Sequence, residues 1–465
     1  MDKRHPKMKN HIVIIGGGAA AAALTLALYR LHPATSRAFY LSIIEPRPEI
    51  GLGIAYGTTS PEHLLNVPST SMSLFSDQAN DFKNWLEKRY PENASAPFQP
   101  RLVYGQYITE RLKETTSHDS TFQHIQDTAV FAQHTPDGWE VTLQSGDTVC
   151  ATTLVLASGN ASPMNPLAQF GINHHPHYIE NPWDDCGVAH NDPDSTILFI
   201  GSGLTMVDHI LSLNAQHHQG PFITVSRHGL LPQSYPPIPT PPDPQWHTSI
   251  LAAATNGSLA SRVSALHDLI QQSEGTLNWQ TIIATLRADT PTLWQALSER
   301  HKAQFLRHLR PRWDSYRHRI SAESEAQLTR MRREGQLVHT RGRITSVRLQ
   351  ADTFSVDITG PKALQHFTVN YIINCTGPYF PQRYRRSLEK SLIEQGDLTP
   401  DRLQLGFRSD QGGAAINAQG NAHPSLFLIG SARRADLWES TAMPEIRVQA
   451  RELAYRLGRS ASYLI

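Results

Sequence analysis

Two segments far apart in the chain follow one plan, in which an apolar run meets closely spaced glycines and then continues as an apolar run of helical character. The first is "HIVIIGGGAAAAALTLAL", which begins at His11, and the second is "ILFIGSGLTMVDHIL", from Ile197 to Leu211. A strand followed by glycines and a helix is typical of the first turn of a βαβ unit in a parallel sheet. The repetition predicts an α/β protein with two Rossmann-like domains.

The first glycine turn has the spacing G-x-G-x-x-A from Gly16 to Ala21. In such a turn, Gly16 permits the tight bend, Gly18 lets a pyrophosphate approach the backbone, and Ala21 lets the helix pack closely on the strand. The next predicted strand, "AFYLSIIE", ends at Glu45, whose carboxylate can accept a hydrogen bond from a ribose hydroxyl. This unit predicts a site for the ADP half of FAD.

The second glycine turn, at Gly201 and Gly203, is followed by a strand with a different ending. The strand "FITVS" ends at Ser226 and continues into Arg227 and His228, where the first unit has an acid. A hydroxyl group and cations suit a ribose 2′-phosphate and leave a bare 2′-hydroxyl without an acceptor. We therefore expect NADPH rather than NADH at this site. One site for FAD and one for NADPH indicate a protein that passes a hydride from nicotinamide to flavin.

Several further segments extend this pattern over nearly the whole chain: "IGLGIAYGTTSPEHLLNVPSTSMSLF", "RLVYGQYITERL", "LVLASGN", "VSRHGLLP", "FLRHLRPRWDSYRHRI", "INCTGPYFP" and "WESTAMPEIRVQA". With the two glycine turns, they resemble flavoproteins with two dinucleotide-binding domains, in particular flavin-dependent monooxygenases and N-hydroxylases and the bacterial FAD/NAD(P)-binding protein group. The resemblance implies that reduced flavin forms a C4a-hydroperoxide with dioxygen. It would then transfer an oxygen atom to a small substrate with a nucleophilic nitrogen or sulfur.

Two short segments resemble the places where the chain of such flavoproteins crosses between the FAD and NADPH domains. One is "VLASG", which ends at Gly159, and the other is "NCTGP", which contains Thr376 and Gly377. The resemblance places these residues beside the cofactors.

The C-terminal segment "LFLIGSARRADLWESTAMPEIRVQA" resembles the last FAD-binding strand, turn and helix. Many proteins of this architecture have Asp after the glycine, whereas this chain has Ser431 after Gly430. Their contact with FAD is inferred from position. Pro444 and Glu445 are favourable at a helix start, and we expect that helix end to lie near the flavin.

The most cationic segment is "RHLRPRWDSYRHRI". It is interpreted as a solvated helix, as a nucleic-acid contact, or as a site for an anion such as a substrate carboxylate or the NADPH phosphate. Pro311 interrupts helical spacing, and the formal net charge of +1 gives no extended track for nucleic acid. Arg317 and Arg319 are the candidates for a catalytic role, and no nucleic-acid or membrane partner is expected.

Three other sequence features limit the chemistry. The three cysteines, Cys150, Cys186 and Cys375, form no C-x-x-C pair, so a disulfide-reductase reaction and a zinc finger are excluded, and a reducing cytoplasm is the expected location. The basic start "MDKRHPKMKN" precedes a strand rather than a secretory signal. No apolar run is long enough for a membrane-spanning helix.

The histidine-rich segment "FGINHHPHYIENPW" contains residues of a monooxygenase fingerprint of the form F-x-G-x3-H-x3-W/Y, although not at its spacing. This leaves the monooxygenase class open. Its "HHPH" run, from His174 to His177, lacks a carboxylate or thiolate to complete a ligand set, so no metal site is predicted.

The domain boundaries follow from these assignments. Residues 1–190 are expected to form the first part of the FAD domain, residues 191–341 the NADPH domain with a helical insertion at about 247–333, and residues 342–465 the second part of the FAD domain. The predicted activity is that of an NADPH-dependent FAD monooxygenase that uses dioxygen and a small substrate. A flavin-dependent dehydrogenase or reductase, and a flavin-binding sensor or scaffold, remain alternatives, and the sequence leaves the oligomeric state open.

Overall fold

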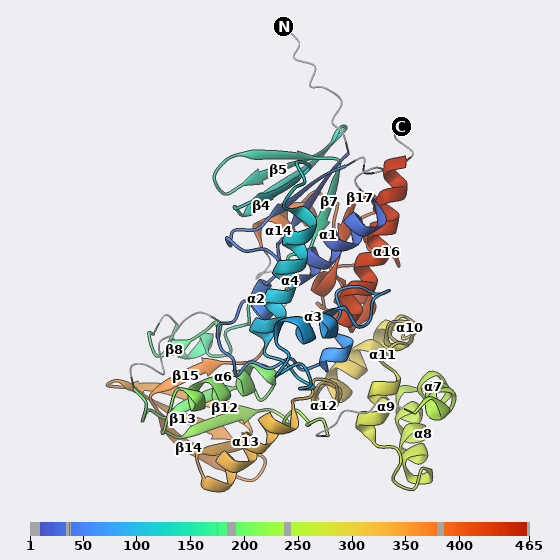
Figure 1. Cartoon of the computed structure of the whole chain (residues 1–465). Coiled ribbons are helices and arrows are strands. Elements are labelled where there is room, and N and C mark those ends of the chain that lie inside the picture. The colour runs from blue at the N-terminus through green and yellow to red at the C-terminus, as the bar shows by residue number, and fades with distance from the viewer. Residues whose placement is uncertain are drawn as a thin grey trace.

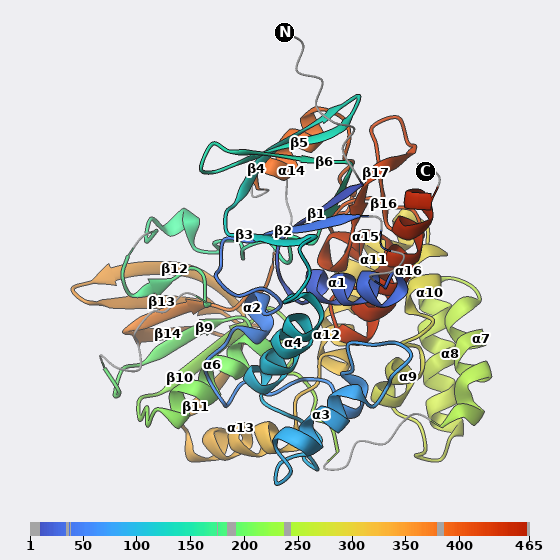
Figure 2. The same cartoon turned by 45° about the horizontal axis from the view of Figure 1, so that its top comes forward.

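The computed structural model describes residues 10–33, 37, 39–173, 175–183, 192–236, 243–378 and 386–462. Two separate parallel-stranded sheets organise these residues, and each is covered by helices on one face and by a small antiparallel sheet on the other (Figures 1 and 2). The predicted α/β architecture with two Rossmann-like units is confirmed.

The first parallel sheet has six strands in the order β16-β17-β7-β1-β2-β3, and only the β16–β17 pair is antiparallel. The strands are β1 (His11–Ile15), β2 (Tyr40–Ile44), β3 (Phe122–Ile125), β7 (Thr153–Leu156), β16 (Ala414–Ile416) and β17 (Ala422–Leu428). Helices α1 (Ala19–Leu31), α4 (Arg101–Thr116) and α16 (Met443–Ser462) bury apolar side chains on one face. The other face packs against α14 (Ser387–Glu394) and the antiparallel strands β4 (Ala129–Thr135), β5 (Gly138–Leu143) and β6 (Thr148–Ala151).

The second parallel sheet has five strands in the order β11-β10-β9-β15-β8. They are β8 (Tyr178–Ile179), β9 (Ile197–Ile200), β10 (Phe222–Ser226), β11 (Leu337–Arg341) and β15 (Tyr371–Asn374). Helices α6 (Leu204–Ala215) and α13 (Ala322–Glu334) cover one face, while β12 (Arg343–Gln350), β13 (Thr353–Thr359) and β14 (Leu364–Val369) cover the other. Strand β9 lies between β10 and β15 as β1 lies between β2 and β7, so the two sheets repeat one topology.

The expected domain boundary at residue 342 does not match the packing of strands β12 to β15, which follow it in the chain. Val347, Phe354, Val356 and Ile358 share a core with the second sheet, and β15 pairs with β9. The physical reason is that a strand can hydrogen-bond in only one sheet, and its apolar face must be buried there. We therefore propose the second boundary near residue 375, where the chain leaves β15.

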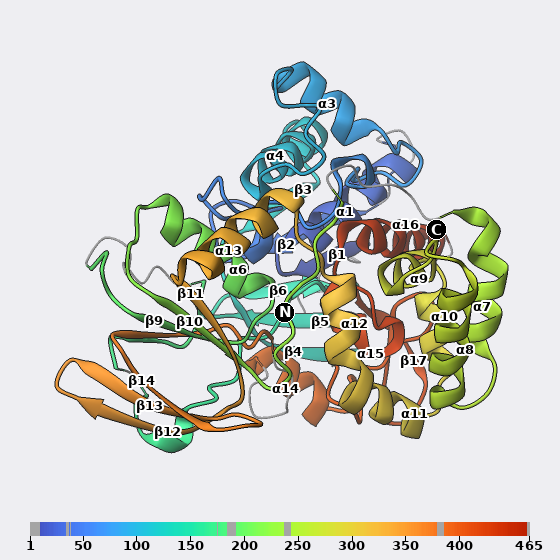
Figure 3. The same cartoon turned by 90° about the horizontal axis from the view of Figure 1, so that it is seen from below.

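A run of short helices occupies the chain between β10 and β11. They are α7 (His247–Thr255), α8 (Leu259–Gln272), α9 (Trp279–Thr285), α10 (Thr290–Gln295), α11 (Glu299–Gln304) and α12 (Arg310–Arg317), with a π-helical turn at Phe305–Leu309. Figure 3 shows α7 to α10 on the side of the molecule where α16 lies, and Figure 1 places α10 nearer to that helix than α7 and α8. Trp294 packs its ring on Trp438 at 4.9 Å and donates to the carbonyl of Ala435 at 2.8 Å. The helical insertion thus packs on the C-terminal segment of the first domain.

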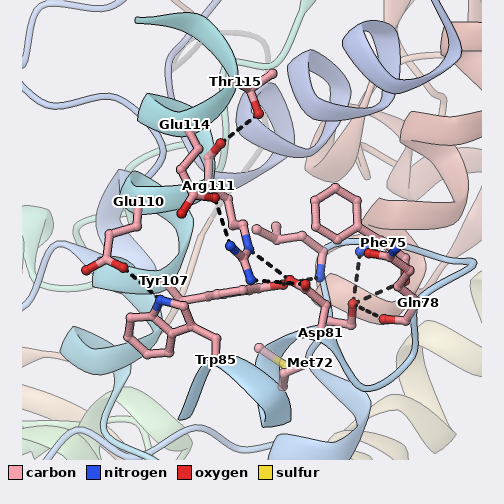
Figure 4. A network of polar contacts seen from close by, with 12 residues as sticks. Met72, Phe75, Gln78, Asp81, Trp85, Tyr107, Glu110, Arg111, Glu114 and Thr115 are labelled. Carbon is pink, nitrogen blue, oxygen red and sulfur yellow. Dashed lines mark hydrogen bonds and ion pairs between the residues drawn. The ribbon is translucent and has the colours of Figure 1, made fainter. Parts of the chain in front are cut away.

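A half-buried polar network fixes the loop that precedes helix α3, Asp81–Arg89 (Figure 4). Arg111 holds both carboxylate oxygens of Asp81, at the start of this helix, at 3.0 Å. The Tyr107 hydroxyl donates to Asp81 at 2.6 Å and accepts from the amide of Leu74 at 3.2 Å. Arg447 of α16 donates to two carbonyls of the same loop, those of Ser71 and Ser73. The loop is therefore tied to α4 and to α16.

Candidate functional site

The first glycine of each turn is required by the packing of the chain itself. Gly16 has a φ of +94°, and a Cβ there would lie 2.7 Å from the carbonyl oxygen of Ala157. Gly201 has a φ of +113°, and its Cβ would lie 2.3 Å from the carbonyl oxygen of Cys375. An L side chain is strained at these φ values and has no room at either position. These two glycines make the bend from strand to helix.

The third residue of each turn is also glycine, but the packing of the chain does not require glycine at this position. Gly18 and Gly203 are the N-cap residues of α1 and α6, with extended backbone at φ −77° and −91°. A Cβ on Gly18 would make ordinary contact with Gly53 at 3.6 Å, and one on Gly203 would meet nothing within 4 Å. Neither helix has a side-chain cap or an acid in its first turn. The amides at both helix starts are therefore free to bind an anion, and only glycine lets a phosphate lie against the backbone there.

Glu45 follows β2 directly beside the first turn. Its Oε2 accepts from the amide of Gly17 at 2.7 Å and its Oε1 accepts from the amide of Arg47 at 3.2 Å. These bonds hold the carboxylate at the carboxyl edge of the sheet, where a carboxylate can accept further bonds from a ribose. Ala21, which is fully buried, lies on the core side of α1.

At the second turn, the strand end is cationic. Ser226 accepts from the amide of Gly229 at 3.2 Å and so closes the turn after β10. The pKa of His228 is lowered by partial burial and by four neighbouring guanidinium groups, which belong to Arg227, Arg341, Arg343 and Arg312. All four arginines are exposed, and none forms an ion pair within the described part of the chain. Their positive charges stay available for an anion.

Arg227 was identified from the sequence, and Arg312 lies in the cationic segment for which the NADPH phosphate was one interpretation, whereas Arg341 and Arg343 were missed. Arg341 ends β11 and Arg343 begins β12, and the parallel β10–β11 pair places Arg341 opposite Ser226. Arg312 comes from α12. The pairing of β10 with β11 brings Arg341 and Arg343 to this strand end, and the packing of α12 adds Arg312. Arginines at strand ends were a signal in the sequence.

The two predicted crossings lie against the two turns. Gly159 and Gly377 have φ values of +70° and +80°, and a Cβ on either would meet nothing within 4 Å. Asn374 accepts from both the amide and the hydroxyl of Thr376, which fixes the second crossing. Pro163 and Pro378 form an antiparallel bridge, so the two crossings run side by side between the sheets.

The C-terminal segment reaches the first glycine turn. A Cβ on Gly430 would lie 3.3 Å from the Cβ of Ala20 in the first turn of α1. Gln449 of α16 accepts from the amide of Gly430 at 3.0 Å and donates to the carbonyl of Ser440 at 3.2 Å. Ser431 is buried, and its hydroxyl has no hydrogen-bond partner among the described residues. This leaves a polar atom of the segment free for a ligand.

The start of α16 meets the helical insertion in a largely buried group, fully so at Arg317 and Glu439, that we name the junction cluster: Arg287, Arg317, Arg319, Arg434, Glu439 and Glu445. Pro444 is the second residue of α16, and Glu445 follows it. Arg287 of the loop after α9 donates to both oxygens of Glu445, at 2.6 and 2.9 Å. Arg317 lies 3.4 Å from Glu445 and 3.5 Å from Glu439. Of the residues predicted for this site, the structure thus brings Arg317 and Glu445 into contact.

Electrostatics in the junction cluster follow from its burial. Burial alone would raise the pKa of Glu439, but Arg317, His318, Arg434 and a hydrogen bond from Trp313 lower it below its usual value. Burial and the adjacent Arg317 lower the pKa of Arg319, whose guanidinium carbon lies 4.0 Å from the centroid of the Tyr235 ring. Glu439 lies in the C-terminal segment assigned to FAD but was given no role there, and nothing near Arg287 resembles a motif.

The histidine-rich segment lies elsewhere. A surface hollow of about 610 Å³ is lined by Phe170, Gly171, His175 and Arg348, among others, and by none of the predicted cofactor residues. His174 and Cys186 lie outside the described residues. Within the described ranges, no three His, Cys, Asp or Glu side chains are placed to hold a metal ion. The same ranges contain no helix that is both long and apolar enough to cross a membrane.

Comparison with known proteins gives a family match for the first third of the chain. A family model described as FAD-NAD(P)-binding matches residues 13–161, which include the first glycine turn, Glu45 and Gly159. No curated protein matches the chain.

Solved structures resemble the chain over nearly its whole length. L-lysine 6-monooxygenase from Pseudomonas syringae is 16% identical, with a TM-score of 0.68 over 97% of this chain and 100% of that one. An ornithine N-hydroxylase from Kutzneria sp. 744 is 14% identical, with a TM-score of 0.67 over 97% and 100%. Thioredoxin reductase from T. acidophilum is 9% identical, with a TM-score of 0.52 over 97% and 98%. The chain thus contains an FAD-NAD(P)-binding domain and has the fold of flavoproteins with two dinucleotide-binding domains.

Proposed function

We propose that this protein is an NADPH-dependent, FAD-containing monooxygenase that acts on a small substrate with a nucleophilic nitrogen or sulfur. One observation carries the proposal: Gly18 and Gly203 occupy equivalent helix starts where the chain's own packing does not require glycine. Two such places in one chain support two bound dinucleotides.

The first turn suits FAD. The amides at the start of α1 would hold its pyrophosphate, and Glu45 would accept from its ribose. The segment from Gly430 to Glu445 lies beside this turn and would contact the flavin end, with the buried Ser431 hydroxyl free to bind it. Bound flavin would supply the transfer of a hydride and the reaction with dioxygen.

The second turn suits NADPH. Arg227, Arg341, Arg343 and Arg312 surround the place where the 2′-phosphate would lie, next to the end of β10. Guanidinium groups recognise phosphate through paired N–H donors, and NADH has no group to neutralise them. The bridge between the two crossings supports an arrangement in which the nicotinamide approaches the flavin directly, as hydride transfer requires.

Two observations favour oxygen transfer over reduction of another protein. The chain has three cysteines and no closely spaced pair, so it lacks the dithiol that a disulfide reductase needs. The solved structures with the higher TM-scores named above are an N-hydroxylase and a lysine monooxygenase. In the proposed reaction, one NADPH, one proton and one dioxygen are consumed, one oxygen atom enters the substrate, and the other leaves as water, with formation of NADP+.

The decisive experiment is rapid mixing of the purified, FAD-loaded protein under anaerobic conditions with NADPH or NADH, followed by oxygenated buffer. We expect fast flavin reduction by NADPH only, then a transient absorbance distinct from both reduced and oxidised flavin. Direct reoxidation with hydrogen peroxide release, with and without candidate amines, would favour an oxidase or reductase. If neither nucleotide reduces the flavin, a flavin-binding sensor is the remaining candidate function.

A further inference from the structure

The junction cluster contains more cationic than anionic groups. Glu445 is shared by Arg287 and Arg317, and Glu439 by Arg317 and the indole of Trp313. Arg319 has no carboxylate within ion-pair distance among the described residues, and the same holds for Arg434, which lies over the ring of Trp438 at 4.8 Å. Four guanidinium groups therefore face two carboxylates.

Neighbouring charges do not correct this excess. Arg310 and Asp314 lie beside Arg434 but pair with each other at 3.3 Å. His318 has its pKa lowered, chiefly by burial, and so does not need a counter-charge near neutral pH. Arg447 adds a further cation near Arg287, and within the described ranges it donates to backbone carbonyls alone. The cluster thus has an excess of two or more positive charges.

Burial makes this excess costly for the protein alone. Arg317 is 5% exposed, and its Nε has no hydrogen-bond partner among the described residues; the buried Nε of Arg319 is likewise unpaired. The hydroxyl of Ser440, which is fully buried, also lacks a partner within the described chain. Buried donors and unneutralised cations are destabilising unless a ligand satisfies them, and guanidinium groups match carboxylates through paired hydrogen bonds.

The cluster is also partly exposed at the surface of the molecule. The side chains of Arg287 and Glu445 remain 26% and 15% exposed, so the group is not sealed within the core. It lies at the first turn of α16, whose Gln449 is bonded to Gly430 of the segment that we assign to FAD. A molecule bound there would lie between the helical insertion and the proposed flavin site.

We propose that the junction cluster binds a dianionic small molecule of the dicarboxylate class, and that the substrate is therefore an acid with net negative charge. The statement that this molecule is the substrate rests on the proposed function, whereas its binding to the junction cluster does not. The unpaired positive charge of the cluster neutralises the two charges of the ligand, while Glu439 and Glu445 hold Arg287 and Arg317 in place. Cationic diamino acids such as lysine and ornithine are repelled.

The first test uses the native protein loaded with FAD and saturated with NADP+, so that neither cofactor can account for binding. Isothermal titration calorimetry measures unbranched dicarboxylates from malonate to adipate, their neutral diamides, and L-lysine. We expect at least one dicarboxylate to bind, with no binding of its diamide or of lysine. Equal binding of diamide or lysine, or no binding of any dicarboxylate, overturns the proposal.

A variant locates the site. Arg319→Gln should lower the affinity for the dicarboxylate by about tenfold or more, because a charged hydrogen bond is lost. Arg348→Gln, on the exposed surface of β12, is the matched control and should bind as the native protein does. Unchanged affinity in Arg319→Gln overturns the assignment. If that variant does not fold, Arg434→Gln gives the same test.

The two proposals fail separately. Calorimetry requires neither oxygen nor turnover. If the protein binds the acid but shows no oxygen-dependent flavin transient, only the proposed monooxygenase activity is refuted. A protein that shows the transient but binds no dicarboxylate refutes only the acidic substrate. Binding to the FAD-free protein alone would show that the cations serve the cofactor, and would overturn the inference.

Discussion

At the scale of single residues, the two glycines of each turn have different reasons to be glycine. Gly16 and Gly201 have positive φ and abut backbone carbonyls, whereas Gly18 and Gly203 have extended backbone and free space. The sequence motif has glycine at both positions and does not distinguish these two reasons. Only the structure separates the glycine that makes the bend from the glycine that leaves room for a ligand.

Replacing Gly18 by Ala should leave the free energy of unfolding of the FAD-free protein nearly unchanged and weaken FAD binding by about tenfold or more. Its Cβ would lie at an ordinary 3.6 Å from Gly53, but in the path of the pyrophosphate. Gly16→Ala is the contrast, and should destabilise the fold by about 2 kcal/mol or more, since its φ is +94°. Thermal unfolding and flavin fluorescence titration measure both. Full FAD occupancy in Gly18→Ala would refute the phosphate site.

Replacing Arg227 by Ala should raise the KM for NADPH by about tenfold, with little change for NADH, because a charged hydrogen bond to the 2′-phosphate is lost. Arg341→Ala should act in the same way, since Arg341 faces the same histidine. Steady-state NADPH and NADH oxidation give the comparison. An equal loss with both nucleotides would exclude Arg227 from the 2′-phosphate site.

At the scale of elements, helix α12 brings arginines of one cationic segment to two different sites. Arg312 faces the end of β10, while Arg317, one and a half turns further along, lies in the junction cluster. Pro311 does not interrupt this helix but stands in its first turn, where its missing N–H costs nothing. Two of the interpretations of this segment, a phosphate site and a substrate anion site, therefore apply to different arginines.

The packing of the insertion on the C-terminal segment depends on Trp294. Trp294→Ala should lower the free energy of unfolding by about 3 kcal/mol, because the ring stacks on Trp438 and its indole N–H donates to Ala435. Trp294→Phe keeps most of the apolar contact and should cost less. We also expect Trp294→Ala to alter the visible spectrum of bound FAD. A variant with native stability would show that the insertion is held elsewhere.

The sequence predicted the elements better than their arrangement. Strand, glycines and helix are local features, so both turns, the strand end at Glu45 and the helical character of residues 247–334 follow from residue pattern. The pairing of β15 with β9, the cations from β11 and β12, and the contact of Arg287 with Glu445 join residues distant in sequence. Periodicity contains no information on such pairs, which depend on which surfaces are left to bury.

At the scale of the whole molecule, a buried polar contact joins the two halves. His63 of the first half bonds to Thr58 at 2.7 Å and to Ser212 of α6 at 2.8 Å. Arg101 of α4 pairs with Asp208 of α6 at 2.8 Å. The helix that begins at the second glycine turn is therefore attached to the first domain.

Acidification should weaken this contact. Burial, with the positive charge of Arg101, lowers the pKa of His63 from 6.5 to about 4, so the folded protein holds it neutral while the unfolded chain takes up a proton. The free energy of unfolding should thus fall as the pH decreases from about 6.5 to about 4, by up to roughly 3 kcal/mol for this group. Thermal unfolding across this range measures it. His63→Gln should reduce the slope, and the exposed His308→Gln should not; equal slopes would exclude His63.

The bridge between Pro163 and Pro378 has a mechanical consequence. Two connections that are fastened to each other would act as one hinge, so a swing of the second half would have a single axis and would have to break the Arg101–Asp208 and His63–Ser212 contacts. Each connection also abuts a glycine turn, through Ala157 at Gly16 and Cys375 at Gly201. Any swing would then carry one nucleotide past the other along a fixed arc, with its pivot close to both pyrophosphates.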